Sequence, residues 1–245
     1  MAGERLVRIL ARLESTGTPE PGTAALCAMS VELAAVTGAG IMLMPGGDPS
    51  GPLCTTDEVS SLLEDLQWTS GEGPCVDAYR HDRPVAEPDL SDPATVRWPA
   101  FTPPAVEAGA RAVFGFPLQV GAVRLGALNL YRDRRGPLSV EQHADTLVMA
   151  GVTARAILVM QAGTAPGRVA PALDAGAGFP YVVHQATGMV AAQLDCGVAE
   201  ALVRMRAHAF GNDRLLTDVA VDVVARRLRF SDDGDDHEPG SGRER

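Results

Sequence analysis

The sequence predicts an α+β domain, an antiparallel sheet flanked by helices, followed by a small all-α bundle of three helices. Over the first 160 residues the apolar pattern alternates between helical spacing and short extended runs, whereas residues 181–228 show helical spacing alone. The stretch between them is rich in Gly, Ala and Pro, as linkers are. The end of the chain is acidic and apolar-poor, which predicts a disordered tail. We therefore expect a domain over 1–162, a linker over 163–178, a bundle over 179–230 and a tail over 231–245.

The elements of the first domain follow from this pattern. Helices are expected over 4–14, 22–36, 58–67, 76–80 and 139–160, and strands over 41–44, 53–55, 84–87, 112–120 and 123–131. The last two strands form the clearest hairpin, with a turn at Gly121-Ala122. Asp57 and Ser139 stand where helix N-caps belong. The stretch 89–104 reads as a loop.

The first and last helices of this domain are both amphipathic. The long helix over 139–160 has one stripe made of Ala144, Leu147, Val148, Gly151, Ala154 and Leu158. We expect the two helices to pack together and to build a four-helix bundle in a homodimer. The alternative is that each helix only covers the sheet.

The C-terminal bundle is expected from three apolar stripes separated by turn signals. The first contains Val182, Ala186, Met189 and Val190; the second Val198, Ala201, Leu202, Met205 and Ala209; the third Leu216, Val219, Ala220, Val223 and Leu228. Cys196-Gly197 and Gly211-Asn212-Asp213 stand where the first two helices should end. About fifty residues suffice for a small core of this kind.

Charge and composition exclude several classes of function. The formal net charge of −10 argues against non-specific coating of DNA, because phosphates are neutralised by cations. Residues 179–230 hold six arginines against five acidic residues, and they are the least acidic part of the chain. The complete absence of lysine removes the P-loop, Schiff-base and kinase-type uses of that residue.

The cysteines and the apolar segments indicate a cytoplasmic protein. Cys27, Cys54, Cys75 and Cys196 show no zinc spacing and are expected to be small buried hydrophobic residues in a reducing compartment. The N-terminus is charged and lacks the apolar core of a secretory signal. The apolar runs near 24–44 and 147–160 are interrupted by charge and glycine, so no membrane span is expected.

The segment 179–230 resembles the ANTAR domain, the RNA-binding output module of bacterial antitermination regulators. The resemblance rests on the AxGM pattern of Ala186–Met189, the helix entry Ala199–Ala201, Met205-Arg206 with Ala209, and Asp218–Ala220. Many members carry a basic residue between the Ala and the Gly of the first pattern, where this chain has Thr187. The resemblance implies that this module binds tandem short RNA hairpins in leader transcripts and prevents terminator formation.

The first 160 residues resemble a GAF domain, the small-molecule-sensing fold. GEGPC (71–75), the loop with Trp98 and the run over 115–131 carry this resemblance. It implies a small-molecule ligand, although the cyclic-nucleotide signature and a chromophore-attachment cysteine motif are missing. GAF followed by ANTAR is a familiar order in actinobacterial regulators. No cofactor is expected.

Seven residues of the bundle are the candidate RNA contacts. They are Gln185, Thr187, Gly188, Arg204, Arg206, His208 and Arg214, with Arg226, Arg227 and Arg229 as further candidates. The side chains of Gln185 and Thr187 are expected to read exposed bases beside Gly188, where the missing side chain permits close approach. Arg206 ranks first among the arginines because it matches the family's motif. The alternatives are a solvated face for the arginines and helix packing for Gly188.

Other residues are weaker candidates. Cys75 is a ligand-facing thiol or, more in line with its surroundings, a buried structural residue. His81 and His143 are lone histidines, which rarely bind haem or metal. Trp98 and Phe101 either line a pocket or anchor their loop. No nucleophile elbow, HExxH or phosphate-binding loop is found, so no catalytic residues are expected and the protein is not expected to be an enzyme.

Three functions compete at this point. The first is a signal-responsive regulator that binds RNA hairpins. The second is a DNA-binding regulator that uses a helix-turn-helix, which the acidic surroundings disfavour. The third is a dimeric sensor or scaffold that does not bind nucleic acid.

Overall fold

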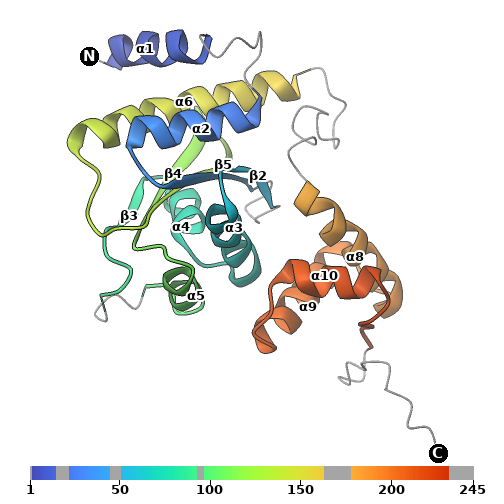
Figure 1. Cartoon of the computed structure of the whole chain (residues 1–245). Helices are drawn as coiled ribbons and strands as arrows, with labels where there is room; N and C mark the ends of the chain where they lie inside the picture. Colours follow the sequence, from blue (N-terminus) through green and yellow to red (C-terminus); the bar gives the residue numbers. More distant parts are fainter. Residues whose placement is uncertain (1, 15–21, 45–50, 93–96, 163–177, 232–245) are drawn as a thin grey trace, which may run out of the picture. The chain divides into compact units, whose positions relative to one another are not determined.

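The structure is a computed structural model that describes residues 2–14, 22–44, 51–92, 97–162 and 178–231. The chain divides into two compact units, Met1–Ala177 (unit 1) and Gly178–Arg245 (unit 2). Each unit is described by itself (Figure 1). The predicted linker lies outside the described residues except for Gly178, and the predicted tail lies outside them except for Ser231.

Unit 1 is built on a five-stranded antiparallel sheet with the order β2-β1-β5-β4-β3. The strands are β1 (Gly38–Leu43), β2 (Pro52–Thr55), β3 (Val85–Glu87), β4 (Ala112–Val120) and β5 (Val123–Arg132). The predicted hairpin of β4 and β5 is confirmed, and Gly121 in its turn has a φ of +59°, which favours glycine. The strand order places β5 at the centre and β2 at one edge.

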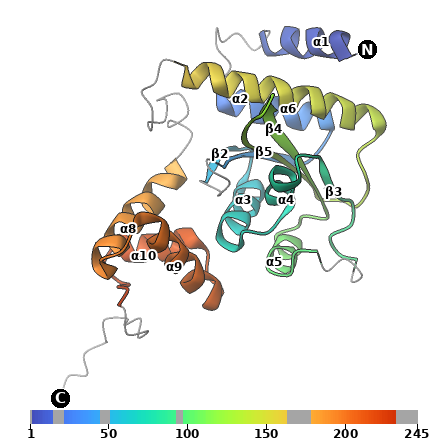
Figure 2. The same ribbon diagram turned by 180° about the vertical axis from the view of Figure 1, so that it is seen from behind.

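Helices cover both faces of this sheet (Figures 1 and 2). On one face lie α1 (Ala2–Glu14), α2 (Thr23–Ala34) and α6 (Val140–Gln161); on the other lie α3 (Glu58–Ser70) and α4 (Pro74–His81). A short helix, α5 (Thr102–Glu107), follows the loop with Trp98 and was not expected from the sequence. Its first turn contains Pro103, which suits a helix start but also reads as a loop signal.

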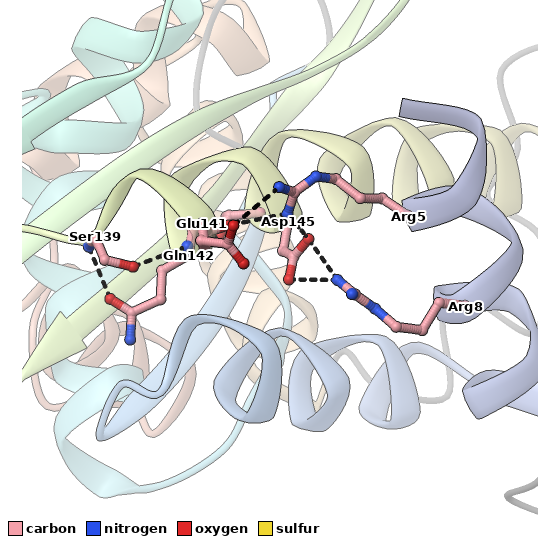
Figure 3. Close-up of polar contacts among 7 residues, drawn as sticks. Arg5, Arg8, Ser139, Glu141, Gln142 and Asp145 are labelled. Carbon is pink, nitrogen blue, oxygen red and sulfur yellow. Dashed lines mark hydrogen bonds and ion pairs between the residues drawn. The ribbon is translucent and has the colours of Figure 1, made fainter. Parts of the chain in front are cut away.

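Both predicted caps are confirmed as capping boxes. The Asp57 carboxylate accepts from the amide of Ser60 at 2.7 Å, and the Ser60 hydroxyl accepts from the amide of Asp57 at 3.0 Å. Ser139 and Gln142 repeat this exchange at the start of α6 (Figure 3). These caps fix the first turns of α3 and α6.

The predicted apolar stripe of α6 is largely wrong. The helix buries Thr146, Met149, Ala150, Val152, Thr153, Ala154 and Ile157, whereas Leu147 is exposed. The cause is the composition of α6, which is apolar almost all round, so that periodicity does not select a face. Among the described helices α6 is also long and apolar enough to cross a membrane, with a mean hydropathy of 1.3, yet its buried face contributes to the core of unit 1.

As expected, α1 and α6 pack together. The Nη2 atom of Arg8 donates to both carboxylate oxygens of Asp145 on α6, at 2.7 Å each, and Asp145 also pairs with Arg5 (Figure 3). Ile9 and Leu13 are the buried apolar residues of α1 in the same core. Because charge-assisted hydrogen bonds have a preferred geometry, these bonds help to fix the orientation of α1 on α6.

The expectation of four unpaired cysteines is wrong for two of them. Cys27 on α2 and Cys54 on β2 form a disulfide, with Cα atoms 6.6 Å apart, whereas Cys75 and Cys196 are free. The two partners are 27 residues apart in the sequence. Cys54 lies beside α2 because the chain turns back from β1 into the edge strand β2. The spacing of the cysteines in the sequence does not predict this contact.

Unit 2 consists of α8 (Gly178–Leu194), α9 (Val198–Gly211) and α10 (Leu216–Val224). Its core contains Val183, Ala186, Val190, Leu194, Ala201, Met205, Ala209, Leu216, Val219, Ala220, Val223, Leu228 and Phe230. The stripes of α9 and α10 are mostly as predicted, but α8 buries Val183 in place of Val182, and Val198 is exposed.

The helices of unit 2 end as the turn signals suggest, although the residues that turn the chain are not glycines. Asp195, Asp213 and Arg226 have φ values of 48°, 51° and 59°. In each case the next amide donates to the carbonyl five residues before it, as in a Schellman motif. The left-handed turn therefore falls on Asp or Arg, at a small cost in backbone energy.

Candidate functional site

The outer face of α8 is the best candidate for contact with a partner. Tyr181, His184, Gln185, Gly188 and Ala192 are all exposed and follow helical spacing, and we call them the α8 outer face. Tyr181 is 74% exposed. Aromatic and amide groups on such a face are suited to stacking on bases and to hydrogen bonding with their edges.

Gly188 has no reason within unit 2 to be glycine. A Cβ atom built at this position meets no heavy atom within 4 Å. Glycine in a helix interior costs about 1 kcal/mol relative to alanine. The alternative that Gly188 permits close packing between helices of its own unit is therefore not supported. Packing inside unit 2 therefore does not require glycine at this position.

Thr187 does not lie on the α8 outer face, and the prediction that it reads bases needs correction. Its side chain is 2% exposed, and its hydroxyl donates to the carbonyl of Val183 at 2.6 Å. The same oxygen lies 3.7 Å from the Met205 sulfur. One position after Ala186 on the helix, Thr187 faces α9 and not the solvent.

The predicted arginines differ in how far their own unit engages them. Arg204 is exposed and pairs with Glu200 one turn before it, at 3.0 Å. Arg214 is half-buried and pairs with Asp222, which also binds Arg227 at 2.7 Å. Arg214 lowers the pKa of Asp222, and Arg227 adds to this effect. Arg214 therefore holds the turn before α10 against that helix, and Arg227 holds the chain after α10 against the same residue. The pair of Arg204 with Glu200 is exposed.

Arg206 and His208 lie at the edge of the core. Arg206 is half-buried, with its Nε atom inside the unit. The ring of His208 packs against the ring of Phe230, with centroids 5.2 Å apart. The main-chain carbonyl of His208 accepts a hydrogen bond from the side chain of Asn212 at 2.8 Å. Arg226 and Arg229 are exposed. The structure thus brings Gln185 and Gly188 together on one face and places His208 in a packing role.

Unit 1 contains a cluster of buried polar side chains that sequence reasoning missed. Glu64, Gln67 and Trp68 on α3, Cys75 on α4 and Asn129 on β5 are all buried, and we call them the buried polar cluster. The Gln67 side chain accepts from the amide of Cys75 at 2.7 Å. Both oxygens of Glu64, the Nε2 atom of Gln67, the indole nitrogen of Trp68 and Oδ1 of Asn129 lack a hydrogen-bond partner of good geometry.

Two glycines make room for this cluster. A Cβ atom on Gly40 of β1 would lie 2.5 Å from Oε1 of Glu64, and one on Gly73 would lie 2.5 Å from the side chain of Gln67. Gly73 also has a φ of +132°, which disfavours other residues. The two polar side chains therefore lie directly against main chain.

Burial controls the ionisation of the cluster. It raises the pKa of Glu64 to about 8, and the nearby amide of Asn129 lowers it by a smaller amount. Near neutral pH, Glu64 is therefore mostly a neutral carboxylic acid. Burial, followed by the proximity of Glu64, raises the pKa of Cys75 well above its usual value. Cys75 is accordingly an unreactive thiol, which agrees with its interpretation as a structural residue.

The remaining candidates have structural explanations. Trp98 and Phe101 are buried and pack edge to face at 5.9 Å, and the Trp98 indole donates to Asp77 at 3.1 Å, so they anchor their loop. The exposed ring of His81 contacts the carbonyl of Asp77 at 2.8 Å, and His143 packs on Phe116. Within the described ranges no group of three His, Cys, Asp or Glu is placed to hold a metal ion.

Of the residues that the sequence analysis did not name, some could have been found from the sequence and others could not. Tyr181 stands two turns and His184 one turn before Gly188, so helical spacing from Gln185 and Gly188 was enough to find them. Glu64 has no such signal. A carboxylate in a helix is usually solvated, and nothing in the local sequence shows that it faces Gly40 in the folded chain.

Several solved GAF domains are similar to the chain, each with a TM-score below 0.5. The GAF domain of a phosphoenolpyruvate-protein phosphotransferase from Acinetobacter has 13% sequence identity and a TM-score of 0.49, covering 66% of this chain and 96% of that one. The corresponding domain from Coxiella burnetii has 15% identity and a TM-score of 0.48, with coverages of 65% and 96%. A GAF domain/HD domain protein from Geobacter sulfurreducens has 16% identity and a TM-score of 0.45, with coverages of 57% and 92%.

These similarities concern the fold and carry no information about ligand, partner or reaction. No protein-family model matches the sequence, and no curated protein sequence matches it.

Proposed function

We propose that this protein is a signal-responsive regulator whose GAF-like unit binds a small molecule and whose three-helix unit binds RNA hairpins. By the resemblance of unit 2 to ANTAR domains, the bound hairpins would be in leader transcripts, and binding would control transcription termination. We further propose that the protein acts in the cytoplasm, as a homodimer and without catalytic activity.

The observation that carries the RNA-binding proposal is the exposed glycine in the middle of α8. Gly188 lowers the stability of its helix, and a Cβ atom at this position would meet no heavy atom within 4 Å. It lies one turn after His184 and beside Gln185 in the helical projection. This is the arrangement expected where a nucleotide comes close to helix main chain and neighbouring amide or aromatic groups read it. The position of Gly188 in the AxGM pattern supports the same proposal.

The buried polar cluster supports the sensory part of the proposal. Buried polar atoms without partners are rare in folded proteins, because each costs about 1–3 kcal/mol. A small polar ligand with its own donors and acceptors would satisfy Glu64, Gln67 and Asn129 together. We infer that the signal is such a molecule.

Exposed apolar residues on α1 and α6 support the homodimer. Val7 and Leu10 of α1 are 67% and 41% exposed, and Leu147 and Val159 of α6 are 44% and 68% exposed. Two copies of this helix pair would bury these residues in a four-helix bundle. Analytical ultracentrifugation of Leu147→Glu tests this arrangement, since a charge at a buried interface position should give monomers.

DNA binding through a helix-turn-helix is the second candidate. In its favour, α8 and α9 meet at an angle of 103° across the turn 195–197, as in that motif. Against it, the first turn of α9, which would enter the major groove, carries Glu200 and no arginine. A carboxylate at this position repels the phosphates on both sides of the groove.

A gel-shift experiment on the full chain separates these functions. The probes are two tandem short RNA hairpins, a DNA duplex of equal length and an unstructured RNA, each at low salt. We expect the hairpins to bind most tightly and Gly188→Leu to weaken that binding at least ten-fold.

The matched control is Gly3→Leu, because Gly3 is also helical, exposed and free of neighbours within 4 Å, but belongs to unit 1. Preference for duplex DNA would support the helix-turn-helix. Absence of binding to all three probes by a dimeric protein, with and without candidate ligands, would support the scaffold.

A further inference from the structure

The disulfide between Cys27 and Cys54 connects the two layers of unit 1 at the edge of the sheet. Cys27 lies in the middle of α2 and is fully buried, whereas Cys54 lies on β2 and is 8% exposed. Since β2 is an edge strand of only four residues, one side of it pairs with no other strand. Cys54 is therefore the more exposed of the two residues.

The two elements joined by the disulfide, α2 and β2, are connected to different parts of unit 1. α2 packs against α6 in the core that includes Met149 and Ile157. β2 continues directly into Thr56 and the Asp57 cap of α3, the helix that carries Glu64. The hydroxyl of Thr56 accepts from the amide of Ala39 at 2.9 Å, which is the polar link between this junction and β1. The bond therefore holds the start of α3 to the helical layer.

The surroundings also accommodate the two cysteines in their reduced form. The sulfur of Cys54 lies 3.1 Å from the carbonyl oxygen of Thr23, which would accept a hydrogen bond from the thiol. Leu26, Ile41 and Leu53 keep α2, β1 and β2 packed in the same core without help from the bond. A pair that has a partner in its reduced form and apolar support around it can open without unfolding the unit.

We propose that Cys27 and Cys54 form a reversible redox site that exchanges with low-molecular-weight thiols and disulfides. Its oxidation state sets how firmly β2 and the start of α3 are held against α2. This site is separate from the proposed RNA interface and needs no ligand of the buried polar cluster.

The exchange balances in both directions. The Cys54 thiolate attacks a sulfur of a small disulfide RSSR, forms a mixed disulfide and releases one RS⁻. The Cys27 thiolate then attacks the sulfur of Cys54 and releases the second RS⁻. The two thiol protons pass to the released thiolates, so that two protein thiols and RSSR give one protein disulfide and two RSH. In the reverse direction RS⁻ attacks Cys54, and Cys27 leaves as the thiolate. A second RS⁻ then attacks the outer sulfur of the mixed disulfide, which forms RSSR and releases the Cys54 thiolate, and the two protons of the RSH molecules pass to Cys27 and Cys54.

The first experiment places the full chain in buffers with a range of ratios of glutathione to glutathione disulfide. After quenching with an alkylating agent in denaturant, which also exposes the buried thiols, the intact mass counts free thiols. We expect one transition from four alkylated cysteines to two, reversible in both directions, with Cys27 and Cys54 as the protected pair. Cys196→Ser is the matched control and should show the same transition with one thiol fewer.

The second experiment compares hydrogen exchange in the oxidised and reduced protein. Reduction should speed exchange of the amides in 52–60 at least ten-fold and leave 181–224 unchanged. The double variant Cys27→Ser/Cys54→Ser should show the exchange rates of the reduced protein at every ratio of glutathione to glutathione disulfide.

Three results would overturn the proposal. The first is four alkylated thiols at every buffer ratio. The second is a bond that is reduced only together with unfolding of unit 1, which would make it a structural staple. The third is equal exchange of 52–60 in both oxidation states.

Discussion

The two units place their polar side chains in opposite ways. Unit 1 buries Glu64, Gln67 and Asn129 in its interior and covers them with helices and sheet. Unit 2 has an interior of alanine, valine, leucine and methionine, where Thr187 is one of only two buried polar residues among those described. Its amide and imidazole groups, such as Gln185 and His184, lie on the surface.

This difference gives the two units different properties. Buried polar groups with unsatisfied bonds make the stability of unit 1 sensitive to protonation and to any molecule that satisfies them. The core of unit 2 is almost entirely apolar, so its stability depends mainly on packing. Neither property depends on how the units are placed relative to one another.

The largest expected difference between the two units is the pH dependence of the stability of unit 1. The pKa of Glu64 is raised from 4.5 to about 8, so its contribution to stability is present below its unfolded pKa and lost as pH rises through 8. A shift of this size corresponds to roughly 4–5 kcal/mol as an upper bound. Glu64→Gln should remove this loss.

Urea unfolding between pH 5 and 9 measures this effect, followed by tryptophan fluorescence. Trp68 and Trp98 are the two tryptophans of the chain, and both belong to unit 1. Glu200→Gln, which changes an exposed carboxylate of unit 2, is the control and should leave the pH profile of the tryptophan signal unchanged. Identical profiles for wild type and Glu64→Gln would contradict the proposed role of burial.

The second effect is a separation of stability and affinity at Gly188. Gly188→Ala should stabilise α8 by up to about 1 kcal/mol, because alanine is the better helix former and its Cβ meets open space. The same change should weaken hairpin binding several-fold if a nucleotide approaches the main chain there. Thermal unfolding by circular dichroism and fluorescence anisotropy with labelled hairpin give the two numbers. A more stable variant with unchanged affinity would remove the argument for close approach.

The strand and helix pattern was predictable because it is local. The hairpin of β4 and β5, the capping boxes at Asp57 and Ser139 and the three helices of unit 2 depend on neighbours within about ten residues. For the same reason Gly188 and Gln185 could be chosen from the sequence. Both lie in one helix, and their spacing alone places them on one face.

The other features depend on which distant elements meet, and the sequence does not contain that information in local form. Cys27 and Cys54 meet because β2 folds back beside α2. Glu64 is buried because Gly40 leaves space for it on β1. The apolar surface of α6 fits a core on more than one side, and Thr187 faces Met205 because α9 crosses α8 there.

The third effect concerns the ion pairs that hold unit 2 together. Arg214→Ala should destabilise unit 2 by about 1 kcal/mol or less, because its partner Asp222 is still partly solvated and keeps Arg227. Arg214 holds the pKa of Asp222 below its usual value, so this contribution is present above pH 4 and is lost as pH falls through the lowered pKa.

Hydrogen exchange of the α10 amides at pH 7 and pH 3 would measure the contribution of Arg214. Arg204→Ala is the matched control, since its exposed pair with Glu200 is worth only about 0.3–0.5 kcal/mol. An Arg214→Ala variant with normal stability but weaker hairpin binding would show that Arg214 contacts RNA instead of stabilising the bundle.

The smallest effect is expected at Thr187, and it tests the boundary between the interior and the outer face of unit 2. Thr187→Val removes a hydroxyl that bonds to the carbonyl of Val183 at 2.6 Å, yet that carbonyl keeps its place in the helical ladder. We therefore expect a stability change within about 1 kcal/mol and a hairpin affinity within two-fold of wild type. Gln185→Ala, two residues before Thr187 and on the opposite, exposed side of α8, should lower affinity several-fold in the same anisotropy assay. If Thr187→Val weakens binding as much as Gln185→Ala does, the first helix must rotate or open when it meets RNA, and the outer face of α8 in the free protein would not be the surface that binds.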